Sequence, residues 1–206
     1  MAQIILDFGS GNTCKNDINY VKRMIDEMHA VNTGKHEVII KWQLFQKAGK
    51  NIPLHWEVFN AAYTYAELMG YETTASVFDL ESLDKLSIYE IPFVKIANNK
   101  DYYYLIDEIP RRIPVYVSVG SYKQETANFV NLKLCCVSNY PADVTDYLKN
   151  FYSIDLRRGI SDHTKDWELF KTCKPRVYEC HYKLDDSEGL DSGEFARTPS
   201  MLAEIL

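Results

Sequence analysis

The sequence predicts an α/β fold of the (β/α)8 barrel type, in a single domain that spans residues 1–206. The first observation behind this prediction is a rhythm in which short β-rich runs alternate with amphipathic stretches, as parallel strands joined by helical crossovers do. The second is that the runs number eight, which leaves about 26 residues for each strand–helix unit, at the small end for this fold. The third is a hydrophobic content of 46%, enough to bury a real core.

The eight predicted strands are short runs rich in β-branched and aromatic residues. They are IILDFG (4–9), EVIIKWQ (37–43), ETTASVF (72–78), FVKIAN (93–98), PVYVSVG (114–120), NLKLCCVS (131–138), RRGISDH (157–163) and RVYECHYKL (176–184). An open doubly wound sheet is the alternative arrangement for eight such strands. The first turn, GSGN, lacks the GxGxxG pattern that marks many sheets of that kind.

Three helices have clear sequence signals. In residues 17–31 the apolar side chains of Ile18, Val21, Ile25 and Met28 recur at helical spacing. A second helix over 54–70 closes on Gly70, and the last, over 198–206, begins with Thr198 as N-cap and Pro199 at the first helical position. The fifth crossover, near 122–130, has room only for a short or irregular helix.

Composition excludes several classes of protein. The formal net charge of −6 and a pI near 5.4 argue against a protein that binds the phosphate backbone of nucleic acids. The cysteines form an odd set of five without CxxC spacing, which fits buried free thiols in a reducing compartment. The apolar run at the N-terminus is too short for a secretory signal or a membrane span. We therefore expect a cytoplasmic protein with no membrane or nucleic-acid partner.

Two histidines mark the end of the predicted barrel where chemistry takes place, at the carboxyl ends of the strands. His163 ends the seventh strand, and His181 lies in the second half of the eighth. Adjacent parallel strands run about 4.8 Å apart, close enough for two imidazoles to share one metal ion. Spacing alone leaves open the alternative that each ring only satisfies a hydrogen bond in the barrel.

Two lysines occupy the same rim inside apolar strands. Lys41, followed by Gln43, ends the second strand and Lys95 lies in the fourth, while Asp7, Ser76 and Ser161 also fall at strand ends. An ammonium group inside an apolar barrel is costly unless it meets an anion. An internal ion pair with Asp7 or Glu179 would explain either lysine singly. For both lysines at one mouth, an anionic ligand such as a phosphate is the better explanation.

Five motifs carry a resemblance to a known family: SDHT (161–164), ECHYKLD (179–185), SNYP (138–141), VIIKWQ (38–43) and FVKIA (93–97). In order and strand position they resemble the sialic acid synthase family, and the resemblance runs from IILDFGSGN to PSMLAEI. Enzymes of that family condense phosphoenolpyruvate with an N-acetylated aldose. The resemblance implies the same reaction class here: an aldose, N-acetylmannosamine or another, would become a 2-keto-3-deoxy sugar acid such as a sialic acid.

The resemblance also implies roles for particular residues. A divalent metal, Mn²⁺ or Mg²⁺, would be held by His163 and His181, with Asp7 where the family carries a catalytic carboxylate. Phosphoenolpyruvate would be gripped by Lys41 and Lys95. The remaining substrate-binding residues would be Gln43, Ser76, Asn98, Ser138, Tyr140 and Ser161, with Asp191 at the acceptor sugar.

The sequence departs from the family mainly around the acceptor. Lys100 and Asn98 stand where the family has a sugar-binding glutamate and a serine, and GSGNTC replaces the first-loop motif GxNHxG. Lys100 would either pair with Asp191 or contact an anionic acceptor. Because the chain ends at the eighth helix, we expect no C-terminal antifreeze-like domain, which in the family reaches a partner subunit and makes a homodimer conceivable. The alternative function is a degenerate barrel that binds a metal or phosphorylated ligand without forming a carbon–carbon bond.

Overall fold

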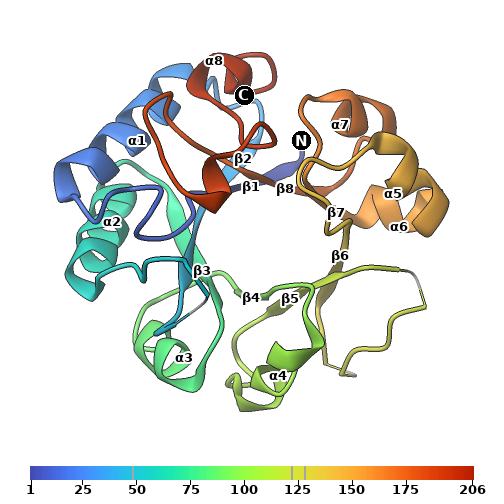
Figure 1. The fold of residues 1–206 in the computed structure, drawn as a ribbon, viewed down its shortest axis with the longest axis horizontal. Helices are drawn as coiled ribbons and strands as arrows, with labels where there is room; N and C mark the ends of the chain where they lie inside the picture. The colour runs from blue at the N-terminus through green and yellow to red at the C-terminus, as the bar shows by residue number, and fades with distance from the viewer. Residues whose placement is uncertain (48, 122, 128) are drawn as a thin grey trace.

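Eight parallel strands close into a barrel surrounded by helices (Figure 1). This computed structural model describes residues 1–47, 49–121, 123–127 and 129–206. The strands are β1 (Gln3–Asp7), β2 (Glu37–Leu44), β3 (Glu72–Val77), β4 (Val94–Ile96), β5 (Val115–Val119), β6 (Leu132–Cys136), β7 (Gly159–Asp162) and β8 (Val177–His181). They pair in chain order, and β1 pairs with β8. The predicted (β/α)8 barrel is confirmed, and the open sheet is excluded.

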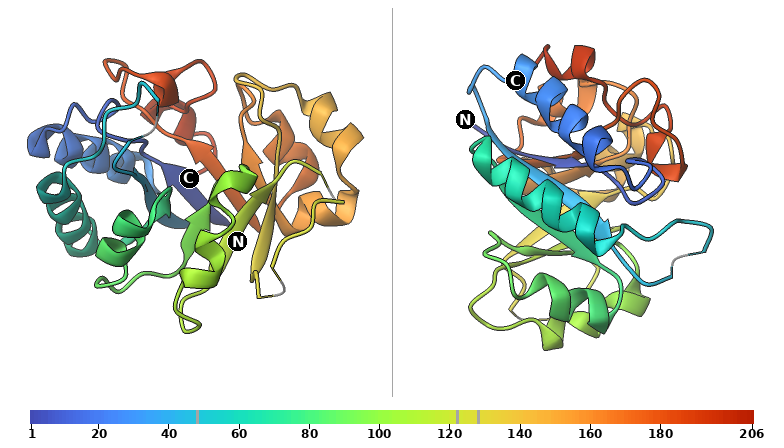
Figure 2. Two further views of the ribbon diagram at one scale, coloured as in Figure 1. Left: turned by 60° about the horizontal axis from the view of Figure 1, so that its bottom comes forward. Right: turned by 90° about the vertical axis from the view of Figure 1, so that its left-hand side faces the viewer.

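The helices cover the outside of the barrel (Figure 2). Among the described residues they are α1 (Ile18–Val31), α2 (Trp56–Leu68), α3 (Leu80–Leu86), α4 (Leu105–Glu108), α5 (Val144–Asn150), α6 (Ser153–Arg158), α7 (Glu168–Cys173) and α8 (Pro199–Leu202), with 3-10 turns η1 (Lys100–Tyr102) and η2 (Leu190–Ser192). No helix joins β5 to β6 among the described residues of that crossover. The predicted irregular segment near 122–130 includes Tyr122 and Asn128, which lie outside the described residues.

The two long helices lie within the ranges predicted for them, and α2 is two residues shorter than predicted at each end. Asp17 accepts hydrogen bonds from the amides of Asn19 and Tyr20 and so caps α1. Val21, Ile25 and Met28 are fully buried as predicted, whereas Ile18 is 39% exposed and does not belong to the buried face. Gly70 follows α2 with a φ of +84°, a conformation that favours glycine. The last helix is shorter than predicted, although it starts at Pro199.

The seventh strand is the element whose predicted start is wrong. Residues Arg157 and Arg158 end α6, and β7 begins only at Gly159. Both arginines are exposed, which a place on a buried strand would prevent. Gly159 is tightly enclosed, since a Cβ atom there would come within 2.5 Å of Leu134. The charged pair therefore stays on the helix, and glycine enters the barrel.

The barrel interior has an apolar floor with a charged layer above it. The floor consists of Ile5, Ile39 and Phe93, against which Tyr116 and Val177 pack. Successive side chains on a strand alternate between faces, so the residues two positions further along point inward as well. Those residues are Asp7, Lys41, Lys95, Ser118 and Glu179, each less than 9% exposed. The fold thus places buried charged side chains directly above the apolar floor.

None of the described helices is both long enough and apolar enough to cross a membrane.

Candidate active site at the carboxyl ends of the strands

A cavity of about 770 Å³ opens at the carboxyl ends of the strands and gathers every predicted site residue. Its lining includes Asp7, Lys41, Gln43, Ser76, Lys95, Asn98, Ser138, Tyr140, Ser161, His163, His181 and Asp191. Strand register explains the assembly. Asp7 pairs with Lys41 on one side and His181 on the other, and Ser76 pairs with both Gln43 and Lys95.

The lining also includes residues that the sequence did not predict as ligand contacts, among them Ser118, Cys136, Glu179 and Phe195. Ser118 and Glu179 had a usable signal, because each lies on the inward face of its strand, two positions from another inward residue. Glu179 had been considered only as an ion-pair partner of a lysine. Phe195 follows η2 in an irregular segment, where sequence periodicity carries no information.

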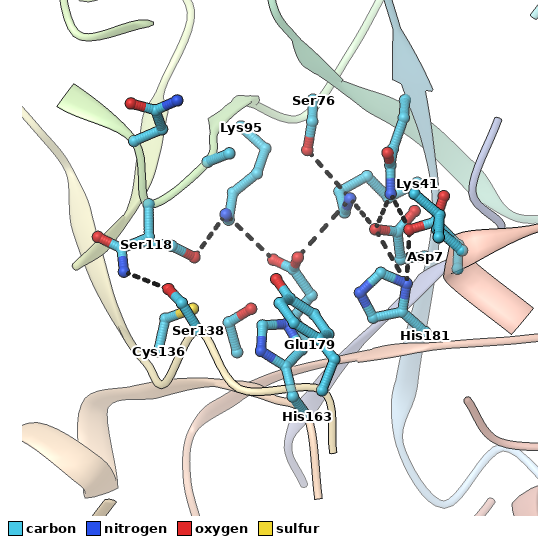
Figure 3. A pocket seen from close by; sticks show the side chains of 18 of the residues that line it. Asp7, Lys41, Ser76, Lys95, Ser118, Cys136, Ser138, His163, Glu179 and His181 are labelled. Atoms are coloured by element: carbon cyan, nitrogen blue, oxygen red, sulfur yellow. Dashed lines mark hydrogen bonds and ion pairs between the residues drawn. The ribbon is translucent and has the colours of Figure 1, made fainter. Parts of the chain in front are cut away.

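Both lysines make internal ion pairs, and Glu179 lies between them (Figure 3). The Lys41 Nζ lies 2.7 Å from Asp7 Oδ2 and 3.6 Å from Glu179 Oε1, and it donates to Ser76 Oγ at 3.0 Å. The Lys95 Nζ lies 3.6 Å from Glu179 Oε2 and donates to Ser118 Oγ at 2.7 Å. The ion pairs that the sequence left open as an alternative are therefore present.

The two lysines are nevertheless in different electrostatic situations. Burial alone would lower the pKa of Lys41, but Asp7 and Glu179 outweigh it, and the net shift is upward. Burial lowers the pKa of Lys95, and the neighbouring positive Lys41 adds to that effect, against only partial compensation by Glu179. The charge on Lys41 is matched within the protein, whereas the charge on Lys95 is under-compensated and would be stabilised by a bound anion.

The two aspartates differ in the same way. Burial would raise the pKa of Asp7, yet Lys41 and His181 lower it to about 2, and the amide of Gly9 donates to its carboxylate at 3.0 Å. Burial raises the pKa of Asp191, and the nearby negative charge of Asp7 contributes to the shift. Gln43 Nε2 donates to both, at 3.0 Å to Asp7 and 3.1 Å to Asp191. The Oδ2 atom of Asp191 has no hydrogen-bond partner among the described residues.

The two histidines lie side by side, with ring centroids 5.5 Å apart. His163 Nδ1 is 2.6 Å from the carbonyl oxygen of Val137. A carbonyl only accepts, so Nδ1 carries the hydrogen and Nε2 is left with its lone pair. His181 Nδ1 lies 3.5 Å from Asp191 Oδ1. Burial, together with the neighbouring His181, lowers the pKa of His163 to about 3.

The residues present fit a divalent cation held by two imidazoles. A neutral ring whose other nitrogen donates to a carbonyl or faces a carboxylate is the arrangement common around protein metal ligands. No group of three or more His, Cys, Asp or Glu side chains suited to a metal occurs among the described residues. An ion held here would therefore need oxygen ligands from water or substrate, and nitrogen donors favour Mn²⁺ over Mg²⁺.

Lys100 does not take part in the site in either of the ways that the sequence left open. It is exposed at the start of η1 and is not among the cavity-lining residues, which at this point are Asn98, Asn99 and Tyr102. Asp191 is bonded to Gln43 instead, and the described residues include no ion pair between Asp191 and Lys100. Asn99 caps the 3-10 turn, and the charge of Lys100 remains in water.

Comparison with known proteins identifies both sequence and structural similarity. The family model described as the NeuB family matches residues 21–206. A search of curated protein sequences gave no match.

Solved structures share the fold at low identity. The N-acetylneuraminic acid (sialic acid) synthetase of Leptospira borgpetersenii serovar Hardjo-bovis, in complex with citrate, has a TM-score of 0.74 and 23% identity, over 98% of this chain and 80% of that chain. The spore coat polysaccharide biosynthesis protein spsE of Bacillus subtilis has a TM-score of 0.76 and 19% identity, and the match covers 98% of this chain but only 65% of that one. A DAHP synthase of Thermotoga maritima has a TM-score of 0.69 at 9% identity, over 98% of this chain and 66% of that chain.

The buried neutral His163 predicts a pH dependence of stability. In the unfolded chain a histidine has its ordinary pKa of 6.5, so below that pH the unfolded state binds a proton that the folded state, with a pKa of about 3, does not. The contribution of neutral His163 to the free energy of unfolding is fully present above pH 6.5. It is lost as the pH falls toward 3, at about 1.4 kcal/mol per pH unit. The free energy of unfolding, measured with urea in EDTA, should fall less between pH 7.5 and pH 5 for His163→Gln than for the unaltered chain. The exposed His55→Gln is the matched control, and equal losses for all three proteins would contradict the prediction.

Proposed function

Because the chain belongs to the NeuB family, we propose that it is a synthase that condenses phosphoenolpyruvate with an aldose to give a 2-keto-3-deoxy sugar acid. One observation carries the proposal: two buried lysines, one of them under-compensated, share a cavity with two adjacent histidines. Such a cavity can hold an anion beside an electrophile, which this condensation requires.

Phosphoenolpyruvate fits the inner part of the cavity. Its phosphate and carboxylate would lie against Lys41 and Lys95, and the anion would compete with Glu179 for both ammonium groups. Ser76 accepts a hydrogen bond from Lys41, so its own hydroxyl hydrogen can be donated to the anion. Ser118 accepts a hydrogen bond from Lys95 and is also hydrogen-bonded to the Cys136 thiol. Ser138 and Ser161 add two hydroxyls to the cavity lining. Burial raises the pKa of Cys136 to about 11, so its thiol stays neutral and adds no repulsion.

The reaction needs an activated aldehyde and a path for protons. A divalent ion on His163 and His181 would supply Lewis acidity toward the aldehyde oxygen. C3 of phosphoenolpyruvate forms the new bond to the aldehyde carbon, water adds to C2, and phosphate leaves by C–O cleavage. The aldehyde oxygen gains one proton and the added water loses protons in the same sequence. These transfers require a group whose pKa is close to the working pH.

Asp191 suits proton transfer better than Asp7, to which the sequence had assigned the catalytic role. With a pKa of about 2, Asp7 remains ionised and holds Lys41 and Gln43 in place, which makes it a poor base. Asp191 has a raised pKa and a carboxylate oxygen without a partner among the described residues. We therefore assign Asp7 an orienting role and Asp191 the proton-carrying one.

The degenerate barrel remains the second candidate, and one observation favours it. The charge of Lys41 is matched by Asp7 at 2.7 Å, so that lysine needs no ligand to explain it. Lys95 argues in the other direction, since its surroundings favour an added anion.

The cavity lining beyond the two lysines predicts an acceptor sugar without a phosphate. Its walls are amides and aromatic rings, from Asn51, Asn98, Asn99, Phe78, Tyr102, Tyr140 and Phe195, and Lys41 and Lys95 are the only Lys or Arg side chains among the described lining residues. A second phosphate would find no cation of its own there.

With Mn²⁺, phosphate release from phosphoenolpyruvate should be faster with unphosphorylated aldoses, N-acetylmannosamine included, than with their phosphate esters. Mass spectrometry of the products identifies the sugar acid. Faster turnover of the esters would reverse the prediction, and no release with any aldose would favour the degenerate barrel.

Replacement of the two lysines separates ligand binding from stability. Lys41→Met and Lys95→Met should each weaken phosphoenolpyruvate binding by about 2 kcal/mol, or roughly thirtyfold, because a charge-assisted contact is lost. Lys41→Met should also lower the free energy of unfolding by about 3 kcal/mol, since it leaves Asp7 without its buried partner. Lys95→Met should cost far less stability. Calorimetry and urea unfolding measure the two effects, and unchanged phosphoenolpyruvate binding in both variants would exclude this site.

The metal assignment has its own test. His163→Ala with His181→Ala should weaken Mn²⁺ binding at least tenfold, because both nitrogen ligands are removed. Titration calorimetry in the absence of substrate gives the affinity. The exposed His55→Ala serves as control, and an unchanged affinity in the double variant would show that the ion binds elsewhere.

A further inference from the structure

Arg197 is a fully buried cation that no step of the proposed reaction uses. It follows η2, has no exposed surface, and is not among the residues that line the cavity. A guanidinium in such a place is desolvated, and a buried ion pair on average adds little net stability. Net stabilisation therefore does not explain why a charged residue occupies this buried position.

The side chain of Arg197 ties the segment after β7 to the segment after β8. One guanidinium nitrogen donates to the carbonyl oxygens of Thr164 at 2.6 Å and Phe195 at 2.7 Å. The other donates to Asp162 Oδ2 at 2.9 Å and to the carbonyl of Asp166 at 2.5 Å. These bonds enclose His163, since Asp162 precedes it and Thr164 follows it in the chain.

Asp162 is itself held from several directions. Its Oδ1 accepts from the amide of Thr164 at 2.7 Å, and its Oδ2 accepts from Thr164 Oγ1 at 3.0 Å and from the hydroxyl of Tyr178. Tyr178 lies on β8, so this carboxylate joins the two strands as well. Arg197 and Asp162 therefore both restrain the turn that carries His163.

The backbone of Arg197 contacts the other histidine. Its amide donates to the carbonyl of His181 at 2.8 Å, and its carbonyl accepts from the amide of Lys183 at 2.9 Å. Phe195, whose carbonyl the guanidinium holds, places its ring 5.0 Å from the ring of His181 and 6.2 Å from that of His163. One residue thus contacts the surroundings of both imidazoles.

We propose that Arg197 is a positioning residue that fixes His163 and His181 at the separation needed to share one cation. The proposal rests on the metal site of the proposed function. It differs from a general stabilising role because it affects the histidine side of the cavity, whereas Lys41 and Lys95 come from β2 and β4 and make no contact with Arg197 among the described hydrogen bonds.

The test compares two ligands in the same variants. Arg197→Met should weaken Mn²⁺ binding at least tenfold, while phosphoenolpyruvate binding measured in EDTA changes less than twofold. Arg197→Lys should resemble Arg197→Met, because one ammonium cannot reproduce the planar set of bonds to three carbonyls and a carboxylate. Arg112→Met, an exposed arginine, is the control and should match the unaltered chain. Near-ultraviolet circular dichroism checks that each variant is folded, and Arg197→Lys carries the test if Arg197→Met does not fold.

A double variant shows whether Arg197 acts through Asp162. The double variant with Asp162→Asn and Arg197→Met should bind Mn²⁺ no more weakly than Arg197→Met alone. If the two residues acted independently, the fold losses of Mn²⁺ affinity from the two substitutions would multiply. Mn²⁺ affinity within twofold of the unaltered chain in both folded Arg197 variants would overturn the proposal. A parallel loss of phosphoenolpyruvate binding would also overturn it, in favour of a general structural role. An unaltered chain that binds no Mn²⁺ at all would remove both the metal site and this inference, while unchanged Arg197 variants beside a binding parent remove the inference alone.

Discussion

The pairing of β1 with both β2 and β8 is the constraint on which the site depends. Closure of the barrel at this seam puts Asp7 in register with Lys41 on one neighbour and with His181 on the other. The first strand and the last are separated by almost the whole chain, yet their ends form one wall of the cavity. The same seam helps to lower the pKa of Asp7 to about 2, because it places Lys41 and His181 beside the carboxylate. An open sheet of the same strands would separate the histidines from the aspartate.

A balance of charge on an apolar floor then determines what the cavity can bind. Lys41 and Lys95 lie above the apolar floor and are at most 2% exposed, and Glu179 lies 3.6 Å from both. Asp7 adds a second carboxylate only on the Lys41 side. The inner cavity is consequently more receptive to an anion beside Lys95 than beside Lys41. Lys41 is therefore paired with the protein's own carboxylates, whereas the charge of Lys95 is less compensated within the protein.

The polar residues outside the cavity matter as much as those that line it. Arg197 and Asp162 form a buried ion pair at 2.9 Å behind the histidines, and Tyr178 and Thr164 complete the hydrogen bonds of the carboxylate. The segment after β7 is short, whereas the segment after β8 covers residues 182–198 and includes η2. By themselves both segments would have many conformations. Buried, directional bonds restrict them to one, so the geometry of the imidazole pair is set by residues that never contact a substrate.

The sequence by itself determined the barrel, the approximate positions of its strands and the identity of the polar residues near their carboxyl ends, because these follow from local patterns. Alternation with period two in VIIKWQ places Lys41 and Gln43 on one face, and Gly70 marks the end of a helix. Local pattern failed at 157–163, where helix and strand meet and exposure of Arg157 and Arg158 decided the boundary. Only the tertiary structure decided that Glu179 would lie between two lysines, that Lys100 would face water, and that Arg197 would be buried behind His163. The reason is physical: charge pairing and burial depend on distances between residues far apart in the chain, and those distances exist only once β1 has closed on β8.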